Sequence, residues 1–156
     1  MENKKVKNAT LCEYDGIRFK SILEMDSYIV LKEEGFNPEY EKKTFHIWEG
    51  KKFLVPCYEQ FKDRKLHKKV WGLNSYKPLD VKYTPDFTFF ICTSSGAMRL
   101  IIIECKGKEN DVYPYKKKLF RTYLETNHPD SIFFEIHSKK QLCSAVEVIK
   151  QLKNGN

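Results

Sequence analysis

The chain has 156 residues, 41% of them hydrophobic and 14% aromatic, which suits a globular core and excludes a disordered chain. Five scattered cysteines without a Cys-x-x-Cys pair, together with no long apolar run and no signal sequence, argue against a secreted disulfide framework, a structural zinc site or a membrane span. The formal net charge of +7 favours a polyanionic partner. We therefore expect a single domain, residues 1–156, in the cytoplasm.

The first half of the chain predicts a helix followed by strands. Residues 1–12 are expected to form a loose basic tail. Ser21 and Glu24 fit the S-x-x-E capping box and Gly35 is a natural stop, so a helix is expected over 20–34. Aromatic and β-branched residues predict strands near 39–48 and 52–57, and 58–80 is expected to be an irregular basic insertion.

The second half predicts a hairpin, a helix, a strand and a helix. Two apolar runs around a Gly-containing connection predict a β-hairpin over 83–107. A helical stripe follows near 115–127, SIFFEIH at 131–137 has the composition of a strand, and 138–153 is the clearest helix, with Ser138 as N-cap. This order predicts an α/β fold, a mixed sheet flanked by helices, with the last strand parallel to a hairpin strand.

Acidic and basic residues gather on the predicted hairpin. Asp86 enters the first strand, and Glu104 and Lys106 near the end of the second share one face, while Cys105 faces the other way. Two carboxylates suit a hard divalent cation, and a lysine beside them could orient a water or stabilise negative charge. A cross-strand salt bridge is the alternative. However, the apolar RLIII run before Glu104 predicts a buried strand, where charged side chains are rare and usually have a function.

Pro85-Asp86 followed by Glu104-Cys105-Lys106 resembles the PD-(D/E)-x-K nuclease superfamily, whose restriction endonuclease-like core has the order α-β-β-β-α-β. The longer stretches YTPDF (83–87) and ECKG (104–107), which contain these residues, and the upstream GIRFKSILE (16–24) are similar in order to small phage nucleases of the endonuclease I type, which resolve Holliday junctions. The resemblance covers about two thirds of the chain and leaves out 46–80 and the last helix. It implies a Mg²⁺- or Mn²⁺-dependent DNA endonuclease, possible phage origin and action in the host cytoplasm.

Carried over residue by residue, the resemblance implies that the metal ligands are Asp86, Glu104, the backbone carbonyl of Cys105, and Glu24. It implies that Lys106 lies near the attacking water. Glu24 has a second explanation, because the capping box accounts for it without catalysis. Thiol chemistry at Cys105 is not expected.

DNA phosphates are expected to contact basic residues in the insertion and on the helix after the hairpin, namely Lys62, Arg64, Lys65, Lys68, Lys69, Lys117, Lys118 and Arg121. The expected substrate is branched DNA, cut by a homodimer whose two-fold symmetry matches a four-way junction. The alternatives are a restriction-like or transposon-end endonuclease acting on duplex DNA, and a non-catalytic basic nucleic-acid-binding protein.

Overall fold

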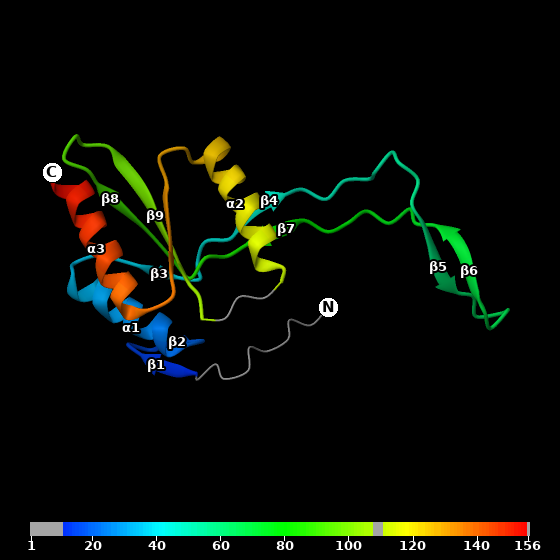
Figure 1. Ribbon diagram of the computed structural model, residues 1–156, viewed down its shortest axis with the longest axis horizontal. Helices are drawn as coiled ribbons and strands as arrows, with labels where there is room; N and C mark the ends of the chain where they lie inside the picture. Colours follow the sequence, from blue (N-terminus) through cyan, green and yellow to red (C-terminus); the bar gives the residue numbers. More distant parts are fainter. Residues whose placement is uncertain (1–10, 108–110, 156) are drawn as a thin grey trace. The chain divides into compact units, whose positions relative to one another are not determined.

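The computed structural model describes residues 11–107 and 111–155 (Figure 1). These residues form a mixed α+β fold, as expected, with three helices and several small sheets. The chain divides into two compact units. We call residues 1–45 with 83–156 the core unit, and residues 46–82 the insert unit.

A four-stranded mixed sheet lies at the centre of the core unit. Its strands in spatial order are β10 (Ile132–Ile136), β9 (Met98–Cys105), β8 (Phe87–Cys92) and β3 (Glu39–Tyr40). β8 and β9 are antiparallel neighbours, with Phe87 opposite Ile103, and β10 runs parallel to β9. The predicted hairpin and the predicted parallel pairing of the last strand are both confirmed.

One face of this sheet is covered by two helices, α1 (Ile22–Glu33) and α3 (Lys139–Asn154), which lie side by side (Figure 1). Side chains alternate along a strand, so this face receives every second residue of β8 and β9, including Phe87, Ile101 and Ile103, all fully buried. These contacts make up the main apolar core. Burying such side chains contributes about 1.5–3 kcal/mol each.

The N-caps predicted at Ser21 and Ser138 are confirmed. Ser21 Oγ accepts a hydrogen bond from Glu24 N at the start of α1, and Ser138 Oγ accepts one from Gln141 N at the start of α3. Gly155 ends α3 at φ 75°, a left-handed conformation that costs glycine little.

The opposite face of the sheet is covered by α2 (Tyr113–Asn127). Phe120 of α2 is fully buried, stacks on Tyr83 at 4.1 Å between ring centroids, and meets Phe133 of β10 edge to face at 5.7 Å. Tyr113 and Lys117 in the first turns of α2 contact Glu135 of β10, and Tyr113 also contacts Lys106 just after β9, so these turns lie beside the carboxyl ends of β9 and β10.

A two-stranded hairpin precedes α1. It consists of β1 (Cys12–Tyr14) and β2 (Ile17–Phe19), which are antiparallel. Asp15 and Gly16 between them both have positive φ, 54° and 73°, as a tight two-residue turn requires. The loose tail expected over 1–12 is wrong at Cys12, which lies in a strand, and residues 1–10 lie outside the described part of the chain.

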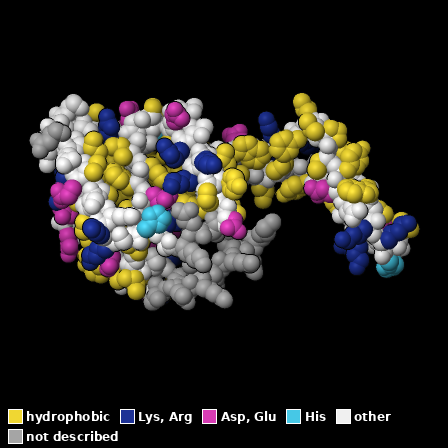
Figure 2. Space-filling view, viewed as in Figure 1, with side chains coloured by type: hydrophobic (Ala, Val, Ile, Leu, Met, Phe, Trp, Pro, Cys, Tyr) yellow, Lys and Arg dark blue, Asp and Glu magenta, His cyan; other side chains and the backbone are white. Residues whose placement is uncertain are grey.

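Two two-stranded sheets are formed by residues of the insert unit together with the residues that flank it. β4 (Phe45–Trp48) and β7 (Val81–Tyr83) form a two-stranded sheet at its chain ends. β5 (Tyr58–Lys62) and β6 (Lys69–Leu73) form a second, which we call the insert hairpin. Figure 2 shows hydrophobic side chains along this unit and Lys and Arg side chains gathered at one end.

Three predictions for residues 39–80 are wrong. The strand expected over 39–48 is two strands with different partners, β3 on β8 and β4 on β7, separated by Glu41 at φ 45°. Residues 52–57 form no strand, and they include Pro56, which has no N–H to donate, and Leu54, which is wholly exposed. Residues 58–80, expected to be irregular, contain the insert hairpin. None of the helices among the described residues is long and apolar enough to cross a membrane.

Candidate active site

Asp86 and Glu104 are brought together by the pairing of β8 with β9. Phe87 is opposite Ile103, and extending this antiparallel register by one residue places Asp86 opposite Glu104. The backbone N–H of Cys105 donates a hydrogen bond to Asp86 Oδ2 at 2.6 Å. Asp86 is 8% exposed and Glu104 is 5% exposed. The structure therefore brings these two predicted site residues together and buries both carboxyl groups.

Burial makes this pair electrostatically costly. It raises the pKa of Asp86 well above its usual range, and the nearby Glu104 and Glu24 carboxylates raise it further. Burial also raises the pKa of Glu104, against the opposing effect of Lys106. Glu104 Oε2 is buried and has no hydrogen-bond partner among the described residues. An added positive charge or a proton at this position would stabilise the pair.

Lys106 provides one such charge. Its Nζ lies 2.5 Å from Glu104 Oε1 and 4.3 Å from the centre of the Tyr113 ring, so it combines an ion pair with a cation–π contact. Burial alone would lower the pKa of Lys106, but the ion pair and hydrogen bond with Glu104, together with the charges of Asp86 and Glu135, raise it. Lys106 is therefore a charged lysine at neutral pH, on the same sheet face as Glu104, as predicted.

Glu24 reaches the same neighbourhood from α1. Its carboxylate accepts hydrogen bonds from Ser21 Oγ at 2.8 Å, from Lys20 N at 3.0 Å and from Tyr40 Oη at 2.6 Å. These bonds confirm its capping role. Its charge also raises the pKa of Asp86, so it lies within electrostatic range of the pair. Capping and proximity to the site are compatible in this arrangement.

The side chain of Cys105 points to the other face, as predicted. Its Sγ lies 3.5 Å from Ser27 Oγ on α1, and burial raises the pKa of the thiol. The thiol is therefore a protonated core group.

Among the described residues, no group of three or more His, Cys, Asp and Glu side chains has the spacing to hold a metal ion.

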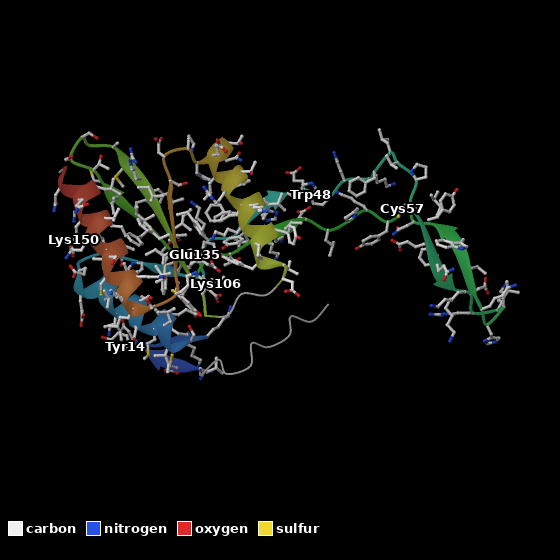
Figure 3. The ribbon with its side chains drawn as sticks, viewed as in Figure 1. Tyr14, Trp48, Cys57, Lys106, Glu135 and Lys150 are labelled. Atoms are coloured by element: carbon white, nitrogen blue, oxygen red, sulfur yellow. The ribbon has the colours of Figure 1, made fainter. Side chains whose placement is uncertain are left out.

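Glu135 is the principal site residue that sequence reasoning missed. It lies opposite Glu104 in the parallel pairing of β10 with β9, on the face covered by α2. It accepts a hydrogen bond from the Tyr113 hydroxyl, pairs with Lys117 at 2.6 Å, and contacts His137 Nε2 at 3.1 Å. Figure 3 labels Glu135 beside Lys106, and the charge of Glu135 also raises the pKa of Lys106.

The Glu135 pKa reflects these partners. Burial alone would raise it, but hydrogen bonds from Lys117, Tyr113 and His137 lower it below the usual range. Glu135 is therefore an ionised carboxylate that holds Lys117 and Tyr113 near Lys106. No sequence signal could identify it, because its position depends on the register of β10 against β9.

Tyr83 adds a hydroxyl to the same interior. The Tyr83 ring is buried on Phe120, and its hydroxyl has no hydrogen bond of normal geometry within the described residues. Burial raises the pKa of this hydroxyl, and the neighbouring Glu104 and Tyr113 raise it further. Tyr83 is thus a neutral hydroxyl in the electrostatic neighbourhood of Glu104.

The predicted phosphate-binding residues lie in both units. Lys117 on α2 forms an ion pair with Glu135. Lys118 and Arg121 are exposed, and Lys118 Nζ lies 5.9 Å from the centre of the Tyr115 ring. Lys117 and Arg121 line an open groove between α2 and β10, which also includes Glu125 and Ser131. The remaining predicted residues lie on the insert hairpin and its turn, where they are exposed: Lys62, Arg64, Lys65, Lys68 and Lys69.

The geometry provides two buried carboxylates, one of them with an oxygen that has no partner among the described residues, beside the charged Lys106 and a third carboxylate, Glu135, which is paired with Lys117. Such a set can hold a divalent cation and a water with it, or share protons. Comparisons of the chain with protein-family models, with curated proteins and with solved structures gave no match.

Proposed function

We propose that the protein is a divalent-metal-dependent DNA endonuclease of the PD-(D/E)-x-K type. The observation that carries this proposal is the convergence of Asp86, Glu104 and Lys106 at the ends of two paired strands, with Glu104 Oε2 buried and unpartnered among the described residues. The order α1, β3, β8, β9, α2, β10 supports the proposal, because it follows the α-β-β-β-α-β order of that nuclease core.

The residues present fit a hard divalent cation. Mg²⁺ is usually held by one or two carboxylates while it keeps several waters, so a cage of three protein carboxylates is not required. Asp86, Glu104 and the backbone carbonyl of Cys105 would hold Mg²⁺ or Mn²⁺, with Glu24 contributing through its charge or through a water. When bound, such an ion acts as a Lewis acid and lowers the pKa of a bound water.

The protein's own residues have separable roles in this proposal. Burial of Asp86 and Glu104 raises their pKa values and so increases the benefit of a cation between them. Lys106 stands beside Glu104, where an ammonium group can orient a water and stabilise negative charge on a phosphate. Glu135 holds Lys117 through an ion pair and Tyr113 through a hydrogen bond. The Tyr113 ring in turn packs against the Lys106 ammonium.

The substrate class in this proposal is DNA, and branched DNA in particular, cut by a homodimer. The net charge of +7 and the exposed lysines of both units support a polyanionic partner. Duplex-specific cleavage by a restriction-like or transposon-end enzyme is the second candidate.

The test is a cleavage panel with a four-way junction, linear duplex, single strand and plasmid, each with Mg²⁺, with Mn²⁺ and with EDTA. We expect metal-dependent cleavage of the junction, and loss of it in Asp86→Asn and Glu104→Gln with DNA binding retained. Glu147→Gln is the matched control, because this exposed carboxylate on α3 pairs only with Lys150 in the described structure and its loss should leave cleavage unchanged. Cleavage that survives in both Asp86→Asn and Glu104→Gln would refute the proposal. Metal-dependent cleavage of duplex in preference to the junction would favour the second candidate.

A further inference from the structure

One face of the insert hairpin carries aromatic rings and lysines that are exposed to solvent. Residues directly opposite each other in an antiparallel pair share a face. We call this surface the Trp71 face, and it is made of three cross-strand pairs: Tyr58 with Leu73, Gln60 with Trp71, and Lys62 with Lys69. Trp71 is 68% exposed and Tyr58 is 62% exposed.

The Trp71 face does not account for the stability of the hairpin. Packing takes place on the opposite face, where the Phe61 ring lies against Gly72 so closely that a Cβ at Gly72 would be 3.2 Å from it. Val70, opposite Phe61, is half-buried. A large exposed ring such as Trp71 is therefore available to a partner.

Charge indicates what that partner is. Lys62 and Lys69 are directly opposite each other, an arrangement that is unfavourable between like charges unless an anion lies near both. The turn that joins the strands adds Arg64, Lys65 and Lys68. Its one acid, Asp63, is occupied within the turn, since its Oδ1 accepts hydrogen bonds from the backbone N–H groups of Lys65 and Leu66.

We propose that the Trp71 face binds unpaired nucleotides, with bases stacked on Trp71 and Tyr58 and phosphates held between Lys62 and Lys69. Aromatic rings interleaved with cations are the combination that proteins use for single-stranded nucleic acid. A base exposes its flat face to a side chain only where it is unpaired.

Duplex DNA fits this surface less well. A two-stranded ribbon can enter the major groove, but there it reads base edges through hydrogen-bonding side chains. Gln60 is the one uncharged hydrogen-bonding side chain among the three pairs apart from the Tyr58 hydroxyl. The surface is built for stacking rather than for reading base edges.

This inference deepens the proposed function, on which it rests for DNA as the partner. A branched DNA interrupts the continuous stacking of bases at its branch point, whereas an ordinary duplex does not. The Trp71 face would therefore recognise the feature that separates the first candidate substrate from the second.

The test uses the fluorescence of Trp71 in the full-length protein. The chain has two tryptophans, and Trp48 stacks on Phe53 elsewhere in the same unit, so Trp48→Phe leaves Trp71 as the only indole. The protein is titrated in EDTA with an oligothymidylate of about 12 nucleotides, a duplex of equal length, and inorganic polyphosphate as a charge-only polyanion. We expect quenching of Trp71 by the single strand and binding of polyphosphate without quenching.

Variants separate stacking from charge. Trp71→Ala should weaken single-strand binding by roughly tenfold, whereas Tyr76→Ala, an exposed aromatic in the same unit but outside the hairpin, should not weaken it. Lys62→Gln with Lys69→Gln should reduce the slope of log affinity against log salt by about 1.4. Lys51→Gln with Lys52→Gln, also exposed and outside the hairpin, is the matched control for charge.

Three outcomes would overturn the inference. The first is that a saturating concentration of single strand leaves Trp71 emission unchanged, and the second is that duplex quenches Trp71 more strongly than single strand does. The third is that the protein forms a dimer in EDTA which Trp71→Ala dissociates, because the face would then bind a second copy of the chain. These outcomes are independent of the nuclease proposal. Quenching without cleavage in Mg²⁺ would refute the proposed activity alone, and cleavage without quenching would refute this inference alone.

Discussion

Replacing Lys106 by Met tests how far the site depends on one cation. Lys106 Nζ lies 2.5 Å from Glu104 Oε1, and the two side chains are 24% and 7% exposed. Met keeps the aliphatic bulk of Lys106 against Tyr113 and removes only the charge. Glu104 is then left as a buried carboxylate whose other oxygen already has no partner among the described residues.

Removing one partner of a buried ion pair costs about 3–5 kcal/mol, because the remaining charge is uncompensated. We expect the lower end for Lys106→Met, about 3 kcal/mol, since the ammonium is partly exposed. The loss depends on pH in a defined direction. Burial raises the pKa of Glu104, so the cost of its negative charge is present above the raised pKa and disappears as the pH falls through that value towards the usual range.

The assay is urea unfolding in EDTA at about pH 8 and about pH 5. Lys106→Met should be strongly destabilised at the higher pH and much less so at the lower pH. The double variant Lys106→Met with Glu104→Gln should regain most of the loss, because position 104 then carries no buried charge. Lys150→Met, which breaks ion pairs on the surface of α3, is the control and should show little pH dependence. The same loss at both pH values, or no recovery in the double variant, would refute the reasoning.

Three further predictions concern the surroundings of the site. Glu135→Gln should slow cleavage by about tenfold at saturating DNA because Lys117 loses its fixed partner, and Lys117→Met should slow it similarly; normal turnover in both would exclude this positioning role. Ser21→Ala should lower the free energy of unfolding by about 1 kcal/mol, since the bonds joining Ser21 to Glu24 at the start of α1 are lost, as urea unfolding will measure; an unchanged midpoint would contradict the cap. Gly50→Ala should speed amide hydrogen exchange across 46–82 but not in the core unit, because the added Cβ would lie 1.8 Å from the backbone oxygen of Pro78. An unchanged exchange rate across 46–82 would show that the insert unit does not depend on the close contact between Gly50 and Pro78.

Local signals in the sequence predicted the elements of the core unit well. Ser21, Ser138 and Gly155 mark helix ends through hydrogen bonds and backbone conformations within a few residues, so no tertiary information is needed. Asp15-Gly16 is an equally local signal for the β1–β2 hairpin, but the strands on either side of it have only three residues each and follow a basic segment that predicts a loose tail.

The insert unit was predicted less well for a physical reason. Alternating buried and exposed residues identify a strand only when one face packs on a core, whereas β5 is exposed throughout and β6 alternates only between exposed and half-buried residues. The basic residues that predicted DNA contact also resemble an irregular solvated loop. The register of the hairpin places Lys62 opposite Lys69, and no single residue predicts this register.

The candidate site shows the same division between local and non-local information. Asp86, Glu104 and Lys106 could be placed together because one hairpin with a short turn joins them, and strand alternation fixes their common face. Glu135 lies on a strand reached only after α2, and its side depends on the parallel register that puts it opposite Glu104. A slip of one residue would turn Glu135 to the face of α1 and α3 and leave Lys117 without its partner. The register of β10 therefore decides whether the site has one lysine or two.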